Sequence, residues 1–145
     1  MKLEKKKSFI EDMNKKCLVK FDYSVGFFNS KLKLFINENN NAIEMSIKSK
    51  ITLQHLKYYL EFFNNASDEN ELLEIYFSGF KRDINIYYGK EKEGGKLICK
   101  AKKSSLLYMD YLIEIAPGVD RVFILSVVLC FIKFLRKRGE AAASS

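Results

Sequence analysis

An unbroken apolar segment near the C-terminus constrains the fold of this chain more than any other feature. Between Val122 and Leu135 the single charged side chain is Lys133. A helix formed by this segment is apolar on every face, and such a helix has to be buried all round. The segment is shorter than the stretch of about 20 apolar residues that spans a bilayer. We therefore expect it to be covered by the rest of the protein.

The residues before the apolar segment predict where its helix begins. Pro117 and Gly118 suit positions i+1 and i+2 of a type II turn. Asp120 follows at the position where a side-chain oxygen caps a helix N-terminus. We expect a helix over about 120–137 and, after it, a disordered tail over 139–145 with the sequence GEAAASS.

The preceding part of the chain has the pattern of a strand meander. Short runs of β-branched and aromatic residues alternate with polar ones, and Asn, Gly, Ser and Asp separate the runs. The expected strands cover 17–23, 32–36, 42–51, 72–77, 83–88, 97–102 and 110–115. The runs NENNN at 37–41 and GKEKEGGK at 89–96 are typical of hairpin connections.

A weak internal duplication relates two of the predicted hairpins. At a constant offset along the chain, Ile43, Met45, Ile47 and Lys48 match Leu97, Cys99, Ala101 and Lys102. The segment 51–63 fits both helical and strand spacing. Because its counterpart in the second copy is too short for a helix, we interpret 51–63 as a strand.

Length and composition indicate one domain. A chain of 145 residues with 48% apolar residues is large and hydrophobic enough to form one core. We place the domain at 16–138 and expect the basic segment 1–15 to be poorly ordered. The three cysteines, Cys17, Cys99 and Cys130, form neither a disulfide framework nor a zinc motif. A reducing, cytoplasmic location fits this cysteine usage.

Several of these motifs resemble a known family. The sequence EIAPGVDRVFILSVV at 114–128, with the hairpin INIYYGKEKEGGKLICKAKK before it and LKLFINENNNAIEMSIKSKITL further upstream, is similar to the LURP-one-related family of the tubby-like superfamily. The resemblance implies a mainly β fold, a tubby-like antiparallel β-barrel of two similar halves wrapped around a C-terminal hydrophobic α-helix. Strands of longer members are missing here, so the prediction allows for an incomplete barrel, open on one side.

The chain offers little for catalysis. Its one histidine, His55, lies among apolar and aromatic residues, where a structural role is typical. We find no nucleophile with a base partner, no metal-spaced carboxylates and no phosphate-binding glycine loop. We therefore expect no enzyme, no metal and no cofactor.

Binding of an acidic partner is more plausible on electrostatic grounds. Basic residues outnumber acidic ones by 25 to 18. On strands, Lys48 and Lys50 share one face, as do Lys100 and Lys102. The duplication places these pairs at equivalent positions, and we expect them on neighbouring strands, where their four ammonium groups are candidates to hold a phosphorylated lipid headgroup. A solvated lysine face that protects strand edges is the simpler alternative.

Three functions follow for testing. The first is a non-enzymatic tubby-like binding or scaffold domain for an anionic phospholipid, cytoplasmic and peripheral at the plasma membrane. The resemblance implies a phosphoinositide as the lipid and associates the domain with plant defence. The second is a small tail-anchored membrane protein that inserts 122–135, because a basic stretch follows that segment. The third and weakest is a single-strand nucleic-acid binder that stacks bases on Tyr87, Tyr88 and Tyr108. No protein partner is indicated.

Overall fold

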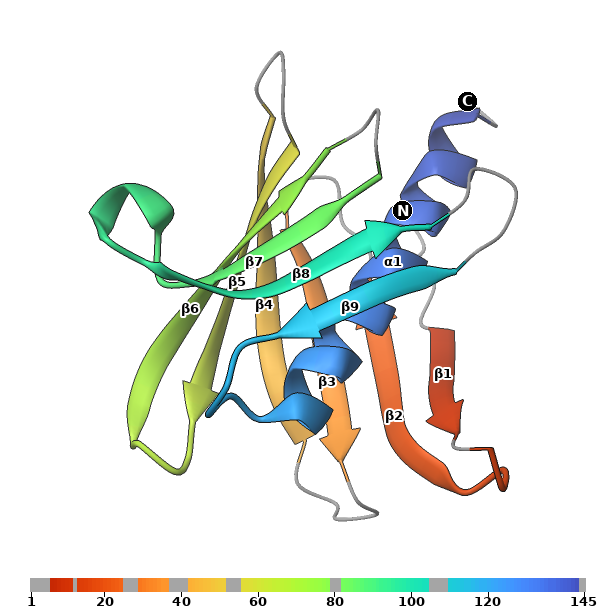
Figure 1. The fold of residues 1–145 in the computed structure, drawn as a ribbon. Helices are drawn as coiled ribbons and strands as arrows, with labels where there is room; N and C mark the ends of the chain where they lie inside the picture. Colours follow the sequence, from red (N-terminus) through yellow and green to blue (C-terminus); the bar gives the residue numbers. More distant parts are fainter. Residues whose placement is uncertain are drawn as a thin grey trace.

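The computed structural model describes residues 6–11, 13–24, 29–36, 42–51, 56–78, 82–104 and 110–143. In these residues nine strands form one antiparallel sheet, and each strand pairs with its neighbours along the chain. Figure 1 shows the sheet curving around the C-terminal helix, α1, which lies between β9 and β2. The elements are β1 (Lys6–Glu11), β2 (Cys17–Ser24), β3 (Asn29–Ile36), β4 (Ala42–Ile51), β5 (Leu56–Asn64), β6 (Glu69–Phe77), β7 (Ile84–Tyr88), the short helix η1 (Glu91–Glu93), β8 (Lys96–Lys103), β9 (Tyr111–Ile115) and α1 (Arg121–Ala143).

The mainly β fold with one C-terminal helix is confirmed. All strands expected from the alternation of apolar and polar residues are present as β2 to β9, and the ambiguous segment 51–63 contributes the strand β5. The connections 37–41 and 52–55 lie outside the described residues, although the strands that they join pair antiparallel. One strand was not predicted. β1 forms within the basic segment 1–15, which was expected to be poorly ordered.

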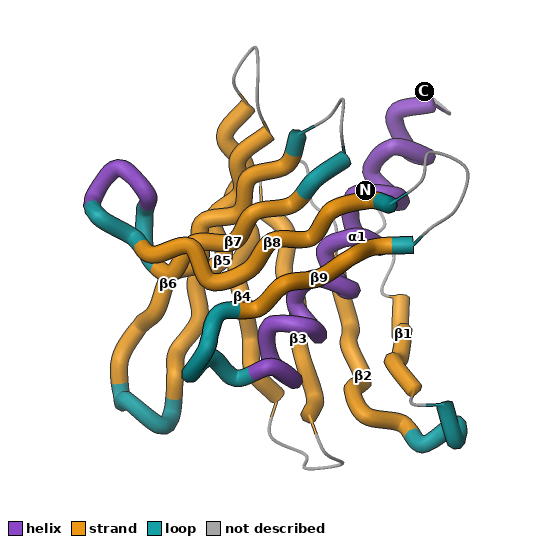
Figure 2. Tube along the Cα trace, in the orientation of Figure 1, coloured by secondary structure: helices purple, strands orange, loops and turns teal. Residues whose placement is uncertain are grey.

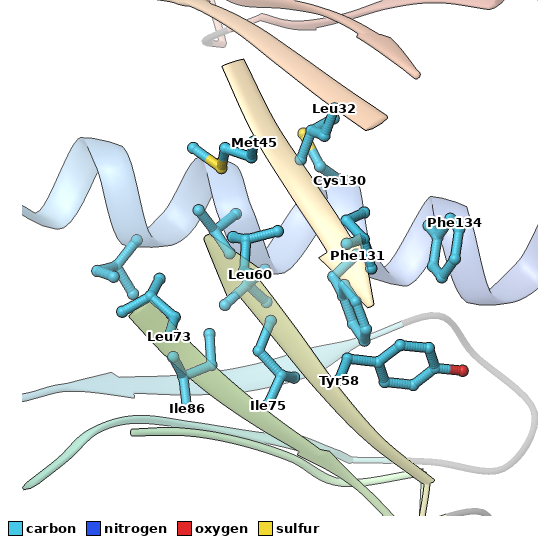
Figure 3. Close-up of a cluster of buried hydrophobic side chains, with 14 of the residues drawn as sticks. Leu32, Met45, Tyr58, Leu60, Leu73, Ile75, Ile86, Cys130, Phe131 and Phe134 are labelled. Atoms are coloured by element: carbon cyan, nitrogen blue, oxygen red, sulfur yellow. The ribbon is translucent and has the colours of Figure 1, made fainter. Parts of the chain in front are cut away.

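The core lies between the inner face of the sheet and α1. Alternate residues of each central strand point to the helix and are almost fully buried, as are the helix residues that face them. Figure 3 shows Phe131 and Phe134 of α1 beside Tyr58 of β5. The ring of Tyr58 meets that of Phe131 edge to face, with the centroids 4.8 Å apart. Aromatic pairs of this kind add to the stabilisation from area burial alone.

The local signals at the start of α1 act as predicted. Gly118 has a φ of 78°, which position i+2 of a type II turn requires and which glycine adopts without strain. The Oδ1 atom of Asp120 accepts a hydrogen bond from the backbone N–H of Phe123 at 3.0 Å. Asp120 is therefore the N-cap, and the helix begins at Arg121. The helix continues past the expected end near residue 137 to Ala143, through the segment that the tail composition predicted to be disordered.

The prediction that α1 is buried all round is wrong on one side. Ile124, Val128 and Phe131 are buried against the sheet. Val122 and Leu125, in contrast, are 48% and 38% exposed and form an apolar stripe on the opposite side. The reason is that the sheet does not close: in the described part of the chain β1 pairs only with β2, and β9 only with β8. The barrel is thus incomplete, and its open side uncovers part of the helix.

The segment 122–135 therefore packs within the domain. Nine of its side chains belong to the core or pack against it, as the interpretation of this segment as a buried core helix predicts. None of the helices described here has both the length and the apolar content of a membrane span.

Truncating the aromatic centre of the helix tests its role in the core. Phe131→Ala removes a side chain that is 1% exposed, and we expect the free energy of unfolding to fall by about 3–5 kcal/mol. Leu125→Ala, on the exposed stripe of the same helix, is the matched control and is expected to cost less than about 1 kcal/mol. Urea denaturation followed by circular dichroism measures both. Equal losses in the two variants would contradict the packing described above.

Thiol labelling tests the same core without a mutation. Burial raises the pKa of Cys99 to about 11 and that of Cys130 to about 12, whereas Cys17 is only half-buried. Because the thiolate is the reactive form, N-ethylmaleimide at pH 8 is expected to label Cys17 first and the other two only after unfolding in urea. Peptide mass spectrometry distinguishes the sites. Rapid labelling of Cys130 in the native protein would show that α1 is not held in the core.

Candidate functional site

The candidate lysines lie on the outer face of the sheet but do not form one compact cluster. Lys48 on β4 and Lys100 and Lys102 on β8 are exposed. Lys50 lies in β4 as well, and its side chain is outside the described part. The two strands are not neighbours, because β5, β6 and β7 lie between them. Four strand spacings separate the pairs by roughly 19 Å along the sheet, so the expectation that they sit on neighbouring strands is wrong.

The sheet register nevertheless connects the two pairs through one cross-strand row. Lys50 is opposite Lys57 on β5, which is opposite Tyr76 on β6. Tyr76 is opposite Asn85 on β7, and Asn85 is opposite Lys100. This row adds a lysine, Lys57, that the sequence analysis did not select. If 51–63 is a strand, alternation puts Lys57 and Tyr59 on the face opposite Tyr58. This alternation was the sequence signal that could have identified Lys57.

The middle of the row holds a buried ion pair on the outer face of the sheet. The Nζ atom of Lys57 lies 3.3 Å from Oε1 of Glu74, and their side chains are 12% and 1% exposed. Oε1 of Glu74 accepts no well-aligned hydrogen bond. Lys57 also lies over the ring of Tyr76, 4.4 Å from its centroid. Burial alone would lower the pKa of Lys57, but hydrogen bonding to Tyr76 and Glu74 outweighs it, so the pKa is raised and the lysine stays charged.

Tyrosines and the β7–β8 hairpin cover this ion pair. The rings of Tyr76 and Tyr87 meet edge to face with centroids 5.7 Å apart. Burial raises the pKa of Tyr87, and the nearby carboxylate of Glu91 in η1 raises it further. The hairpin returns to β6 through a hydrogen bond from the N–H of Gly89 to the carbonyl of Leu72. Figure 2 shows the short helix η1 and α1 in well-separated parts of the molecule. Glu74 alternates with the core residues Leu73 and Ile75 along β6, so this cluster lies on the other face of the sheet, separate from the apolar core.

The exposed lysines differ in how far their charge is neutralised. Nζ of Lys48 lies 3.1 Å from Oε2 of Glu61 on β5. Lys100 and Lys102, in contrast, have no carboxylate within ion-pair distance in the described residues. Lys102 lies opposite Leu112 on β9, and Lys100 lies opposite Glu114 without forming an ion pair, so the least neutralised charge of the predicted lysines described lies on β8.

A groove of about 300 Å³ lies on the same outer face, across β3, β4 and β5. Lys31 and Lys33 line it on the β3 side, and the register places Ser46 directly between Lys31 and Glu61. The short side chain of Ser46 leaves the space that the longer neighbours surround. The sequence analysis missed this groove because no local motif marks it.

The other residues considered for a site contribute less. His55 and Tyr108 lie outside the described residues. Tyr87 is half-buried and its ring packs edge to face against Tyr76, while Tyr88 is 49% exposed. Within the described ranges, His, Cys, Asp and Glu side chains do not gather into a group of three or more that would hold a metal ion.

Breaking the buried ion pair tests the cluster. Lys57→Ala leaves the carboxylate of Glu74 buried without its cation, so we expect the free energy of unfolding to fall by about 3 kcal/mol. The double variant Lys57→Met, Glu74→Leu removes both charges and is expected to be close to wild type. Lys48→Ala, which breaks an exposed pair, is the control and should cost less than about 1 kcal/mol. A Lys57→Ala variant as stable as the Lys48→Ala variant would show that Glu74 is hydrated.

The family of this chain is shown by comparison with known proteins. A search of curated proteins and a search of solved structures each returned no match. The family model described as LURP-one-related matches residues 1–132, from before β1 into α1. The matched range includes every strand of the sheet and the turn at Pro117 and Gly118, and it supports the tubby-like interpretation of the domain. The chain belongs to the LURP-one-related family.

Proposed function

We propose that this protein is a non-enzymatic binding domain whose outer sheet face holds anionic phospholipid headgroups at the cytoplasmic surface of a membrane. The observation that carries the proposal is the pair of exposed lysines on β8, Lys100 and Lys102, which form no ion pair in the described structure. The cross-strand row connects them to Lys50 on β4 through Lys57, whose own charge is neutralised by Glu74.

Electrostatics gives this face enough affinity to matter. A lysine near an anionic membrane surface contributes about 1 kcal/mol. The four predicted lysines therefore add roughly a thousandfold to the binding constant. Because they are spread along the face, they suit several headgroups of a lipid surface better than one small ligand. The net charge of +7 favours the same class of partner over a basic one.

The family suggests the biological setting. The resemblance of the Pro117 turn and its flanking hairpins to the LURP-one-related family implies a role in plant basal defence. In our proposal the domain acts there as a scaffold, located in the cytoplasm and peripheral at the plasma membrane. No step of this function requires catalysis, a metal or a cofactor.

Vesicle pelleting with charge-reversed variants tests the proposal. The variant with Lys48, Lys50, Lys100 and Lys102 all changed to Glu is expected to lose pelleting with vesicles that contain an anionic phospholipid in phosphatidylcholine. Wild-type pelleting is expected to weaken as salt is raised, since exposed charges are screened. Circular dichroism checks that each variant keeps the fold.

A smaller, matched comparison separates the effect of the lysine face on vesicle binding from the effect of net charge. Lys100→Glu with Lys102→Glu is compared with Lys15→Glu and Lys16→Glu, two exposed lysines in the turn between β1 and β2. Both variants change the net charge equally, but only the first is expected to release the protein from vesicles. Unchanged pelleting of the fourfold variant would remove the lysine face as the binding site.

A further inference from the structure

The groove across β3, β4 and β5 has an electrostatic polarity that the rest of the outer face lacks. Lys31 and Lys33 supply ammonium groups on the β3 side. Glu61 on β5 supplies a carboxylate on the other side, while Glu44 on the middle strand, β4, lies opposite Lys33. A molecule seated over Ser46 would meet Lys31 at one end and Glu61 at the other.

The charges of the groove are not equally available. Lys33 and Glu44 form an ion pair, and hydrogen bonding to Lys33 lowers the pKa of Glu44, which keeps that carboxyl ionised. Oε2 of Glu61 forms an ion pair with Nζ of Lys48 at 3.1 Å, and the side chain of Glu61 is still 48% exposed. Lys31 is exposed and has no ion pair in the described part of the chain. The groove therefore keeps one uncompensated cation beside an accessible carboxylate.

Two further features favour a lipid headgroup over a free solute. Phe63 lines the groove and is 46% exposed, which suits an aromatic ring at the interface between headgroups and acyl chains. The volume of about 300 Å³ is at the small end of ligand sites, which suits one headgroup and no acyl chain. The register also places the groove next to Lys48, at the β4 end of the lysine face.

We infer that this groove selects a phospholipid headgroup that carries a primary ammonium together with a net negative charge, the chemistry of phosphatidylserine. The inference rests on the proposed function and names its headgroup. Lys31 binds the acidic groups of the headgroup, and Glu61 accepts hydrogen bonds from the ammonium, with Ser46 leaving room between them. A phosphoinositide or phosphatidylglycerol headgroup has no ammonium for Glu61 and places only hydroxyl or phosphate groups against it.

Vesicles of matched charge test this inference. Phosphatidylserine and phosphatidylglycerol each carry one net negative charge, so equal fractions of each in phosphatidylcholine differ in headgroup chemistry and not in surface charge. We expect the full chain to bind the phosphatidylserine vesicles more tightly by up to about fivefold, the effect of one exposed ion pair. Equal binding to both vesicles overturns the inference and leaves the proposed function standing. Failure to bind either overturns both.

Three variants locate the preference. Glu61→Gln removes the negative charge that pairs with the ammonium and frees Lys48, so binding to phosphatidylglycerol should rise while the preference disappears. Glu114→Gln, on β9 opposite Lys100, changes the net charge by the same amount and should raise binding to both lipids with the preference kept. Ser46→Gln fills the groove without changing charge and should abolish the preference alone. A preference that survives Glu61→Gln and Ser46→Gln overturns this site.

Discussion

The requirement to cover the apolar surface of α1 governs the rest of the structure. The helix presents Ile124, Val128, Phe131 and Phe134 to the sheet, and each is at most 3% exposed. Burying a large side chain of this kind stabilises the fold by roughly 1.5–3 kcal/mol. A flat sheet can meet only one side of a helix, so the meander has to curve. The curvature brings β2 and β9, which are far apart in the sheet, to opposite sides of the same helix (Figure 1).

The sheet covers the apolar surface of α1 incompletely, which explains the exposed apolar stripe of Val122 and Leu125. In the described chain the first and last strands of the sheet are not paired with each other, so nothing that the structure describes covers Val122 and Leu125. A strand edge and a half-covered helix together are an aggregation hazard in principle. Leu112 on β9, which is 61% exposed, lies on one of the two edge strands. This side is where the fold departs furthest from a closed barrel.

The outer face follows from the inner one. Once the helix determines which residues point inward, strand alternation sends their neighbours outward, and the register orders those into rows across β4 to β8. The row through Lys57 and Tyr76 carries a buried ion pair beneath the β7–β8 hairpin. The adjacent outer row contains Lys48, Tyr59 and Glu74. The row beyond it, through Ser46 and Glu61, is open and forms the groove. The outer face therefore carries both a closed, structural polar cluster and an accessible groove.

The features that the sequence alone determined are local or periodic. Strand alternation predicted β2 to β4 and β6 to β9, and the internal duplication favoured a strand where β5 lies. The Pro117 and Gly118 turn with Asp120 predicted the start of α1, and the apolar run 122–135 predicted its burial. The family resemblance predicted the incomplete barrel around the helix. The predicted helix end near residue 137 was too early. The alanines after the glycine at 139 have a high helix propensity, and the helix continues to Ala143.

Only the tertiary structure decided which of these residues meet. It separated Lys48 from Lys100 by three strands, buried Glu74 against Lys57, placed Ser46 in a groove between Lys31 and Glu61, and left one side of α1 uncovered. Each of these depends on pairing between strands or on closure of the sheet. Such contacts join positions distant in the chain, and a periodic pattern states which face a residue takes without stating which neighbour it finds there.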